Sequence, residues 1–199
     1  WHEKIAKRFE RRYVEGRLFR DRFQVWSRIL NKYCNAKETY ALDLGCGAGN
    51  FAVLLAAQCH SLKCVDGSQA MVRLCRENLA NAGYENIDVS VADIDEYCVK
   101  QSSFFDVICC SSVLEYIDNF DVTMRKVLDR MEEDGVLIFS VPNADSVYRR
   151  LERVAFRTMR KPAYYRYVKN TFSLKNLSKR LGSHALDVIE AHYMTDAPY

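Results

Sequence analysis

A glycine-rich turn between a strand-like run and a helix-like run constrains the fold of this chain more than any other feature. Residues 41–52 read Ala-Leu-Asp-Leu-Gly-Cys-Gly-Ala-Gly-Asn-Phe-Ala, with glycines at alternate positions. Glycine has no Cβ, so a ligand can lie directly against this backbone, and the amides that begin the next helix face the same place. A dinucleotide fingerprint would need its third glycine where this chain has Asn50. We therefore expect a nucleotide-like ligand other than NAD.

A carboxylate follows this turn at the distance that a nucleotide site requires. Asp66 ends the apolar run 62–66, about 20 residues beyond Gly45. In βαβ nucleotide-binding units, an acidic residue at this place accepts hydrogen bonds from the ribose hydroxyls. We predict the same role for Asp66, because an ionised carboxylate has lone pairs for two donors.

Strand-like and helix-like segments alternate through the middle of the chain. This alternation predicts an α/β fold with a doubly wound, mostly parallel sheet and helices on both faces. The continuous apolar run 136–141 is typical of a strand that is covered on both sides. We expect Asp134 and Gly135 to turn the chain into that strand. The predicted strands are 39–43, 62–66, 87–92, 105–111 and 136–141, and the predicted helices are 48–58, 69–82, a short one after Asp93, and 120–132.

The segments on either side of this alternation have a different character. Apolar residues at helical spacing, first Ile5 and Phe9 and then Phe19, Phe23, Trp26 and Leu30, predict two amphipathic helices. A third amphipathic helix is expected over 146–161, and a fourth begins after its N-cap Ser173. The predicted organisation is an N-terminal helical cap (1–37), a ligand-binding core (38–145), a basic helical insertion (146–181), and the end of the core sheet (182–199), with a sixth strand over 186–194.

Composition excludes several classes of protein. The eight cysteines form no C-x-x-C pair, so neither a zinc site nor a disulfide framework is predicted, and we expect reduced thiols in a cytoplasmic protein without a metal. No apolar run approaches the roughly 20 residues of a membrane span. The net charge is only +3, but residues 148–180 contain eleven Lys and Arg against one Glu. Such an asymmetry points to an anionic partner.

Five motifs in the right order resemble the class I S-adenosylmethionine (SAM) dependent methyltransferases. They are the D-x-G-x-G-x-G turn, Asp66, and the segments 92–94, 110–116 and 141–143. Within that family, the chain is similar to the small-molecule branch that includes the ubiquinone-biosynthesis O-methyltransferases. The resemblance implies a Rossmann-like sheet, SAM as cofactor, and methyl transfer to a small-molecule acceptor at oxygen. The family's sheet also has a seventh, antiparallel strand, and nothing after Tyr199 can supply it, so either the chain is cut short or the hairpin is built differently. Since the first residue is Trp1 and not Met, we expect the true N-terminus to be missing.

The resemblance also assigns roles to particular residues. Asp43 would accept a hydrogen bond from the methionine ammonium, or would fix the loop by accepting from backbone amides. Asp93 would accept from the adenine amino group, with Asp95 and Glu96 as competitors, or would cap the next helix. The residues predicted to bind the cofactor are Asp43, Gly45, Cys46, Gly47, Gly49, Asp66, Gly67, Ser68, Asp93, Ile94, Ser111 and Val113.

The chemistry of the acceptor is less constrained by the sequence. Many relatives have a histidine after the Glu of the fourth-strand motif, but this chain has Tyr116, so Glu115 and Tyr116 are weak candidates for catalysis. Asn143 would contact the substrate or form a turn. Three functions compete for the basic region 146–180. In order of preference, they are a lid that grips an anionic small molecule, a peripheral membrane contact through 146–167, and a nucleic-acid surface. A solvated helix that only covers the sheet is the further alternative. A lipid-like or RNA acceptor and a non-catalytic SAM-binding subunit are also compatible with the sequence, and the oligomeric state is open.

Overall fold

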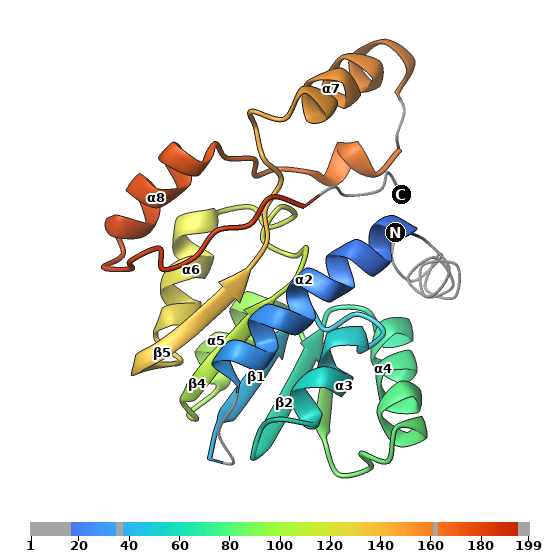
Figure 1. Cartoon of the computed structure of the whole chain (residues 1–199), viewed down its shortest axis with the longest axis vertical. Helices are drawn as coiled ribbons and strands as arrows, with labels where there is room; N and C mark the ends of the chain where they lie inside the picture. The colour runs from blue at the N-terminus through green and yellow to red at the C-terminus, as the bar shows by residue number, and fades with distance from the viewer. Residues whose placement is uncertain (1–16, 35–37, 161–162, 195–199) are drawn as a thin grey trace.

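Five parallel strands form the centre of the molecule (Figure 1). The computed structural model describes residues 17–34, 38–160 and 163–194. Its strands are ordered β3-β2-β1-β4-β5, and every neighbouring pair is parallel. This arrangement confirms the predicted α/β fold. The strands are β1 (Tyr40–Leu44), β2 (Ser61–Asp66), β3 (Asp88–Val91), β4 (Phe105–Cys110) and β5 (Met131–Phe139).

Helices cover both faces of this sheet, because successive strand residues point to opposite sides. Ala41, Cys64 and Cys109 pack in one apolar cluster with residues of α2, α3 and α4. Their neighbours Leu42 and Val65 pack in a second cluster with residues of α5, α6 and α8. The helices are α2 (Arg17–Tyr33), α3 (Asn50–Ala56), α4 (Gln69–Asn81), α5 (Ile94–Lys100), α6 (Phe120–Leu128), α7 (Val147–Met159) and α8 (Leu174–Gly182), with a 3₁₀ turn η1 (Ala163–Tyr167).

Side-chain caps define the starts of most of these helices. The predicted N-cap Ser173 accepts a hydrogen bond from the amide of Asn176, as expected. Four further helices start at a polar residue whose side chain accepts from an amide in the first turn, namely Ser68, Asp93, Asn119 and Ser146. These caps place the helix starts beyond the carboxyl ends of the strands, where the loops meet.

Helix α2 confirms the second of the two helices predicted before the core. Trp26 and Leu30 are buried on its apolar stripe, and the Trp26 ring lies 5.0 Å from that of Phe51 in α3. The first predicted helix, with Ile5 and Phe9, lies outside the described residues. None of the helices in the described part of the chain is long and apolar enough to cross a membrane.

Strand β5 differs from its prediction. It begins at Met131 and contains Asp134 and Gly135, which were predicted to form a turn. The register explains the difference, since Phe105 pairs with Met131 but Val107 pairs with Val136. A bulge therefore absorbs the extra residues within the ladder. The predicted helix 120–132 is correspondingly shorter and ends at Leu128.

The predicted sixth strand over 186–194 is wrong. This segment has no ladder partner among the described residues, and a groove of about 670 Å³ lies between it, β5, α2 and α8. Side chains hold the segment instead: Glu190 accepts hydrogen bonds from Lys32 and from the Tyr33 hydroxyl on α2. The backbone groups of the segment and of β5 are therefore not paired as neighbouring strands.

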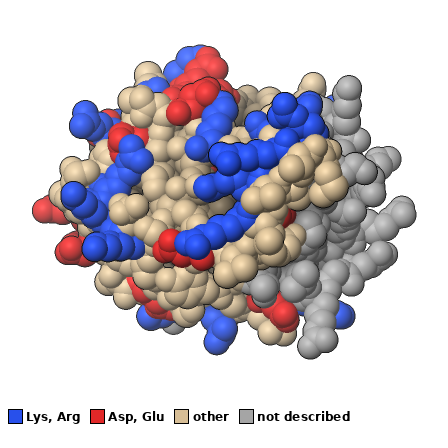
Figure 2. Space-filling view, turned by 90° about the horizontal axis from the view of Figure 1, so that it is seen from above, with Lys and Arg blue, Asp and Glu red and all other residues tan. Residues whose placement is uncertain are grey.

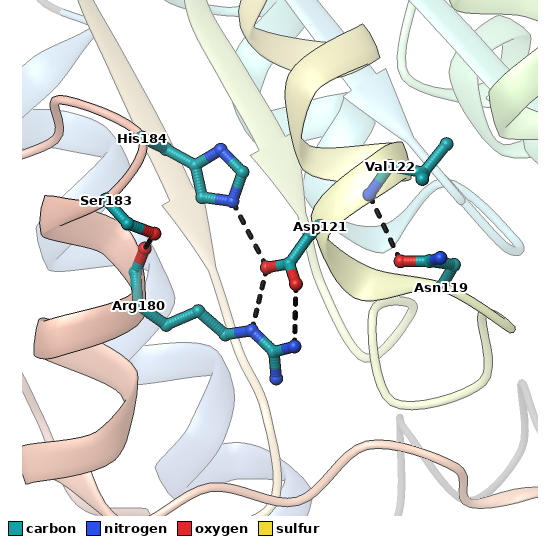
Figure 3. Close-up of polar contacts among 6 residues, drawn as sticks. All are labelled: Asn119, Asp121, Val122, Arg180, Ser183 and His184. Atoms are coloured by element: carbon teal, nitrogen blue, oxygen red, sulfur yellow. Dashed lines mark hydrogen bonds and ion pairs between the residues drawn. The ribbon is translucent and has the colours of Figure 1, made fainter.

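Helix α8 is attached to α6 by an ionic contact (Figure 3). Arg180 donates through Nε and Nη2 to the two oxygens of Asp121, each at 2.7 Å, and His184 Nε2 lies 3.2 Å from Asp121 Oδ1. The guanidinium also lies over the rings of Phe120 and Phe172. Arg180 and His184 lower the pKa of Asp121 to about 2. This forked pair fixes α8 on the face of the sheet that α6 covers.

We expect Asp121→Asn to lower the free energy of unfolding at neutral pH, by up to about 1 kcal/mol because the pair is partly exposed. The folded-state pKa of Asp121 lies below the ordinary value for Asp of about 3.9. Its contribution is therefore present above that ordinary value and is lost as the pH falls toward 2. Urea unfolding at several pH values measures this, with exposed Asp129→Asn at the end of the same helix as control. A difference between wild type and Asp121→Asn that is independent of pH would contradict the ionic contribution.

Candidate functional site

A cavity of about 660 Å³ lies at the carboxyl edge of the sheet. Its walls come from the loops that follow four consecutive strands, β1 to β4. Ligands of doubly wound sheets bind at this edge. All of the predicted cofactor-binding residues except Gly49 line the cavity, together with Ala48, Asn50, Phe51, Met71, Ala92, Asp95, Ser112, Tyr116, Ile117, Asp118, Asn119 and Thr123.

The three glycines of the turn are required for different structural reasons. All have positive φ angles, which disfavour other residues. A Cβ on Gly45 would lie 2.1 Å from Val113 Cγ2, and one on Gly49 would lie 2.7 Å from Cys75 Sγ. A Cβ on Gly47 would meet nothing within 4 Å. Packing therefore excludes side chains at Gly45 and Gly49, whereas Gly47 leaves open space in the cavity, and Gly49 serves as the N-cap of α3.

Asp66 joins two loops of the cavity wall. Its Oδ2 accepts a hydrogen bond from the amide of Gly47 at 2.9 Å, and its Oδ1 accepts from the amide of Ser68 at 2.8 Å. The carboxylate therefore sets the position of the glycine turn relative to the loop after β2. An ionised carboxylate has about four lone-pair positions, so it can accept from more than two donors.

Asp43 is a buried carboxyl group in the wall of the cavity. Only 1% of its surface is exposed, and its Oδ2 has no hydrogen-bond partner among the described residues. None of the backbone amides in the described part of the chain donates to it, so the predicted loop-fixing role is not what the structure contains. Burial, with Cys75 and Asp66 nearby, raises the pKa of Asp43 well above its usual range. Such a group is stabilised by a cationic hydrogen-bond donor.

Asp93 has the capping role that was one of its two predicted roles. Its Oδ1 accepts hydrogen bonds from the amides of Asp95 and Glu96 at the start of α5. Asp93, Ile94 and Asp95 line the cavity, but Glu96 does not. Capping uses one oxygen of Asp93, so its other oxygen is still available to a ligand.

Arg22 is a site residue that the sequence interpretation missed. Its side chain is buried, and Nη2 lies 2.8 Å from Ser111 Oγ, 2.6 Å from Ser112 Oγ and 3.2 Å from Ser140 Oγ. Ser111 and Ser112 line the cavity, and Ser112 has a positive φ of 56°. A signal was present, because Arg22 lies four residues before Trp26 and therefore shares its buried stripe. A positive charge on an apolar helix face commonly has a specific purpose.

The two weak catalytic candidates separate in the structure. Tyr116 lines the cavity, whereas Glu115 is buried and does not. The Glu115 carbonyl oxygen accepts from the amides of Lys169 and Asn170, so this residue anchors the segment after η1.

Asn143 forms a turn, since its Oδ1 accepts from the amide of Asp145, and it lines the groove beside β5 instead of the cavity. Among the described residues, no group of three His, Cys, Asp or Glu side chains is arranged to hold a metal ion.

Comparison with known proteins identifies the family. The model of a methyltransferase domain family matches residues 18–191, so the chain belongs to this family. A ubiquinone biosynthesis O-methyltransferase from Rickettsia canadensis is 26% identical over 119 residues, which cover 60% of this chain and 49% of the relative. An uncharacterized protein from Haemophilus influenzae is 31% identical over 115 residues, or 56% of this chain and 45% of that protein. The chain thus spans about half the length of the curated relatives it matches.

Solved structures support the same fold. Magnesium protoporphyrin IX methyltransferase from Synechocystis, with bound S-adenosylhomocysteine, has a TM-score of 0.75 at 16% identity, covering 97% of this chain and 89% of that one. The N-methyltransferase NodS from Bradyrhizobium japonicum, also in complex with S-adenosylhomocysteine, has a TM-score of 0.61 at 21% identity, covering 70% and 69%. At these identities the likeness establishes the Rossmann-like methyltransferase fold.

We expect Gly45→Ala to lower the free energy of unfolding by about 2–5 kcal/mol, because it combines a clash with Val113 and a left-handed backbone. Gly47→Ala is the matched control: it has the same backbone requirement without the clash and should lose only about 1–2 kcal/mol. Urea unfolding of both variants measures the difference. Equal losses would mean that the contact between the turn and Val113 does not restrict the site.

Proposed function

We propose that this chain is a SAM-dependent methyltransferase that moves a methyl group to an oxygen atom of a small-molecule acceptor. Family membership supports the reaction class, and relatives named as O-methyltransferases support the acceptor atom. Structural neighbours with bound S-adenosylhomocysteine support the cofactor. The observation that carries the proposal is the buried Asp43 oxygen without a partner among the described residues, in the wall of a cavity bordered by a glycine turn.

The residues of the cavity suit a nucleoside with a cationic amino-acid tail. Asp43 would accept from the ammonium group, which compensates a buried carboxylate. Asp66 would accept from the ribose hydroxyls, because a carboxylate can accept from several donors at once. Asp93 and the amide of Ile94 would contact the adenine. The backbone of Gly45, Cys46 and Gly47 would lie along the tail, Gly67 and Ser68 along the ribose edge, and Ser111 and Val113 near the methionine part. Gly49 would act indirectly, by starting α3.

The cluster of Arg22 with Ser111 and Ser112 would hold the carboxylate of that tail. Arg22 donates to both hydroxyl oxygens, which leaves each hydroxyl proton free to point into the cavity. The guanidinium behind them adds a positive charge in a buried setting. Hydrogen bonds to an ionised group are about twice as strong as neutral ones. Arg22 is thus proposed as a positioning residue.

When bound, SAM supplies a methyl group on a sulfonium, which leaves as a neutral thioether. The acceptor oxygen would form a bond to the methyl carbon while the carbon–sulfur bond breaks. The bonding electrons would stay on sulfur, and the proton of the acceptor hydroxyl would pass to water. The chain contributes mainly by holding the oxygen in line with the methyl group, which is worth up to about 7–11 kcal/mol in favourable cases. Tyr116, which lines the cavity beside Ile117, is the residue proposed to contact the acceptor.

The eight cysteines are free thiols. Seven of them belong to the two apolar clusters, and Cys59 packs against the first cluster. Reduced, buried thiols support a cytoplasmic location, which stays a proposal. An anionic acceptor also stays a proposal, supported by the basic residues of the 146–181 region.

Incubation with methyl-labelled SAM and a panel of phenols, catechols and other small hydroxyl compounds tests the activity. We expect transfer of label to at least one panel member and formation of S-adenosylhomocysteine.

We also expect Asp66→Ala to weaken S-adenosylhomocysteine binding by about 10–100-fold in calorimetry, because it removes hydrogen bonds to a charged group. Exposed Asp88→Ala, at the opposite end of the sheet, is the control and should bind as wild type. Binding of S-adenosylhomocysteine without transfer to any acceptor would favour the non-catalytic SAM-binding subunit.

The role of Arg22 has its own test, because adenosine lacks the carboxylate. We expect Arg22→Met to weaken S-adenosylhomocysteine binding by about tenfold or more and to leave adenosine binding nearly unchanged. Arg28→Met, exposed on the same helix, should change neither. Calorimetric titration of each variant with both compounds measures the ratio of affinities. An equal loss for the two ligands would place the effect in the fold of α2 and not at the carboxylate.

A further inference from the structure

Helix α7 buries its one acidic side chain and exposes an apolar stripe. Glu152 is its one buried residue, with 6% of its surface exposed. Val147, Leu151 and Val154 are 71%, 63% and 57% exposed. A helix that packed on the core would show the opposite pattern, with the apolar stripe buried. The outward stripe therefore has no partner among the described residues.

The inner face of α7 is held by a compact polar network on η1. Arg149 Nη1 donates to Glu152 Oε2 at 2.9 Å and to the Tyr164 hydroxyl at 2.7 Å, and the Tyr164 hydroxyl donates to Glu152 Oε1. Tyr164 is itself buried. Arg153 donates to the hydroxyl of Tyr165. Because these contacts use polar groups on one side of the helix, they determine which side faces outward.

The outer face combines apolar and basic side chains. The spacing of Val147, Leu151 and Val154 puts them on one stripe of the helix. Arg150 and Arg157, seven residues apart, lie next to this stripe and are exposed. Five arginines occur between 147 and 160, and the single acidic residue there is the inward Glu152. Seen from this side, Lys and Arg side chains run alongside uncharged surface (Figure 2).

This helix belongs to an excursion of the chain that is attached next to the cavity. The excursion closes where Asn143 bridges to Phe172, just beyond β5. Its returning arm is fixed to the loop after β4, since Asn170 Nδ2 donates to the carbonyl oxygens of Leu114 and Ile117. Ile117 lines the cavity. Helix α7 consequently stands above the carboxyl ends of the strands (Figure 1).

We propose that the outer face of α7 docks on an anionic lipid bilayer. The apolar stripe enters the headgroup region while Arg150 and Arg157 lie at the level of the lipid phosphates, as in helices that lie in a membrane interface. A second copy of the chain is a poorer occupant, because two such faces would oppose their arginines. Nucleic acid is a poorer occupant as well, since phosphates leave the apolar stripe in water. That the methyl acceptor then reaches the cavity from the bilayer is a consequence that rests on the proposed function.

Flotation of the full chain with vesicles tests the docking. One vesicle preparation is phosphatidylcholine alone, and the other is phosphatidylcholine with phosphatidylglycerol in equal parts. We expect wild type to float with the anionic vesicles and to be released by high salt. The double variant Leu151→Glu/Val154→Glu should bind at least about tenfold more weakly, because it places charges in the apolar stripe. Val99→Glu, at a similarly exposed position on α5, is the control and should float as wild type.

Thermal unfolding and S-adenosylhomocysteine titration of the same samples keep the two proposals apart. Wild type that remains in the dense fraction with both vesicles, or a double variant that floats as well as wild type, would overturn the docking while leaving the methyltransferase proposal intact. A dimer seen by light scattering without vesicles, and lost in the double variant, would assign the face to a second copy and would also overturn it. Vesicle binding without binding of S-adenosylhomocysteine would instead support the docking and contradict the cofactor.

Discussion

The site depends on hydrogen bonds between the glycine turn and the end of β2. The amides of Gly45 and Cys46 donate to the carbonyl oxygen of Val65, and the Asp66 carboxylate accepts from Gly47 and Ser68. These bonds close the end of a parallel strand pair, where the backbone would otherwise have unpaired donors. They hold two loops of the cavity wall in one arrangement, so the remaining ligand contacts act on a preformed frame.

The loop after β4 connects this frame to the rest of the molecule. Its residues line the cavity, its serine hydroxyls accept from Arg22 on α2, and its carbonyl oxygens accept from Asn170 after η1. Helices that are far apart in the sequence thus meet at one short segment. The methionine end of the proposed cofactor site and the base of the α7 excursion share this support. A bilayer docked on α7 would consequently face the edge of the sheet at which the cavity lies.

Sequence patterns predicted the core well and the periphery poorly, for identifiable reasons. The strands around β1 are mostly apolar, and few other residues could replace Gly45 and Asp66 at their positions. The start of β5 was misplaced because Asp134 and Gly135 suit a turn as well as they suit a bulge. The segment 186–194 has strand-like residues, but Lys32 and Tyr33 draw Glu190 toward α2 and away from a ladder. Glu115 was a candidate because it is an acidic residue within a motif, but in the folded chain it is buried and does not line the cavity.

The sequence by itself was sufficient to predict the glycine turn, the capping residues Asp93 and Ser173, and the order of strands and helices. Each of these features depends on neighbours within a few positions of the chain. Contacts between distant segments could be decided only by the folded chain. Arg22 contacts the serines after β4, and Asp121 pairs with Arg180. The apolar stripe of α7 faces outward because a three-residue polar network holds the other side of the helix. Amphipathic spacing predicts that a helix has an apolar and a polar face. Which of the two faces is covered depends on the residues that tertiary packing places against it.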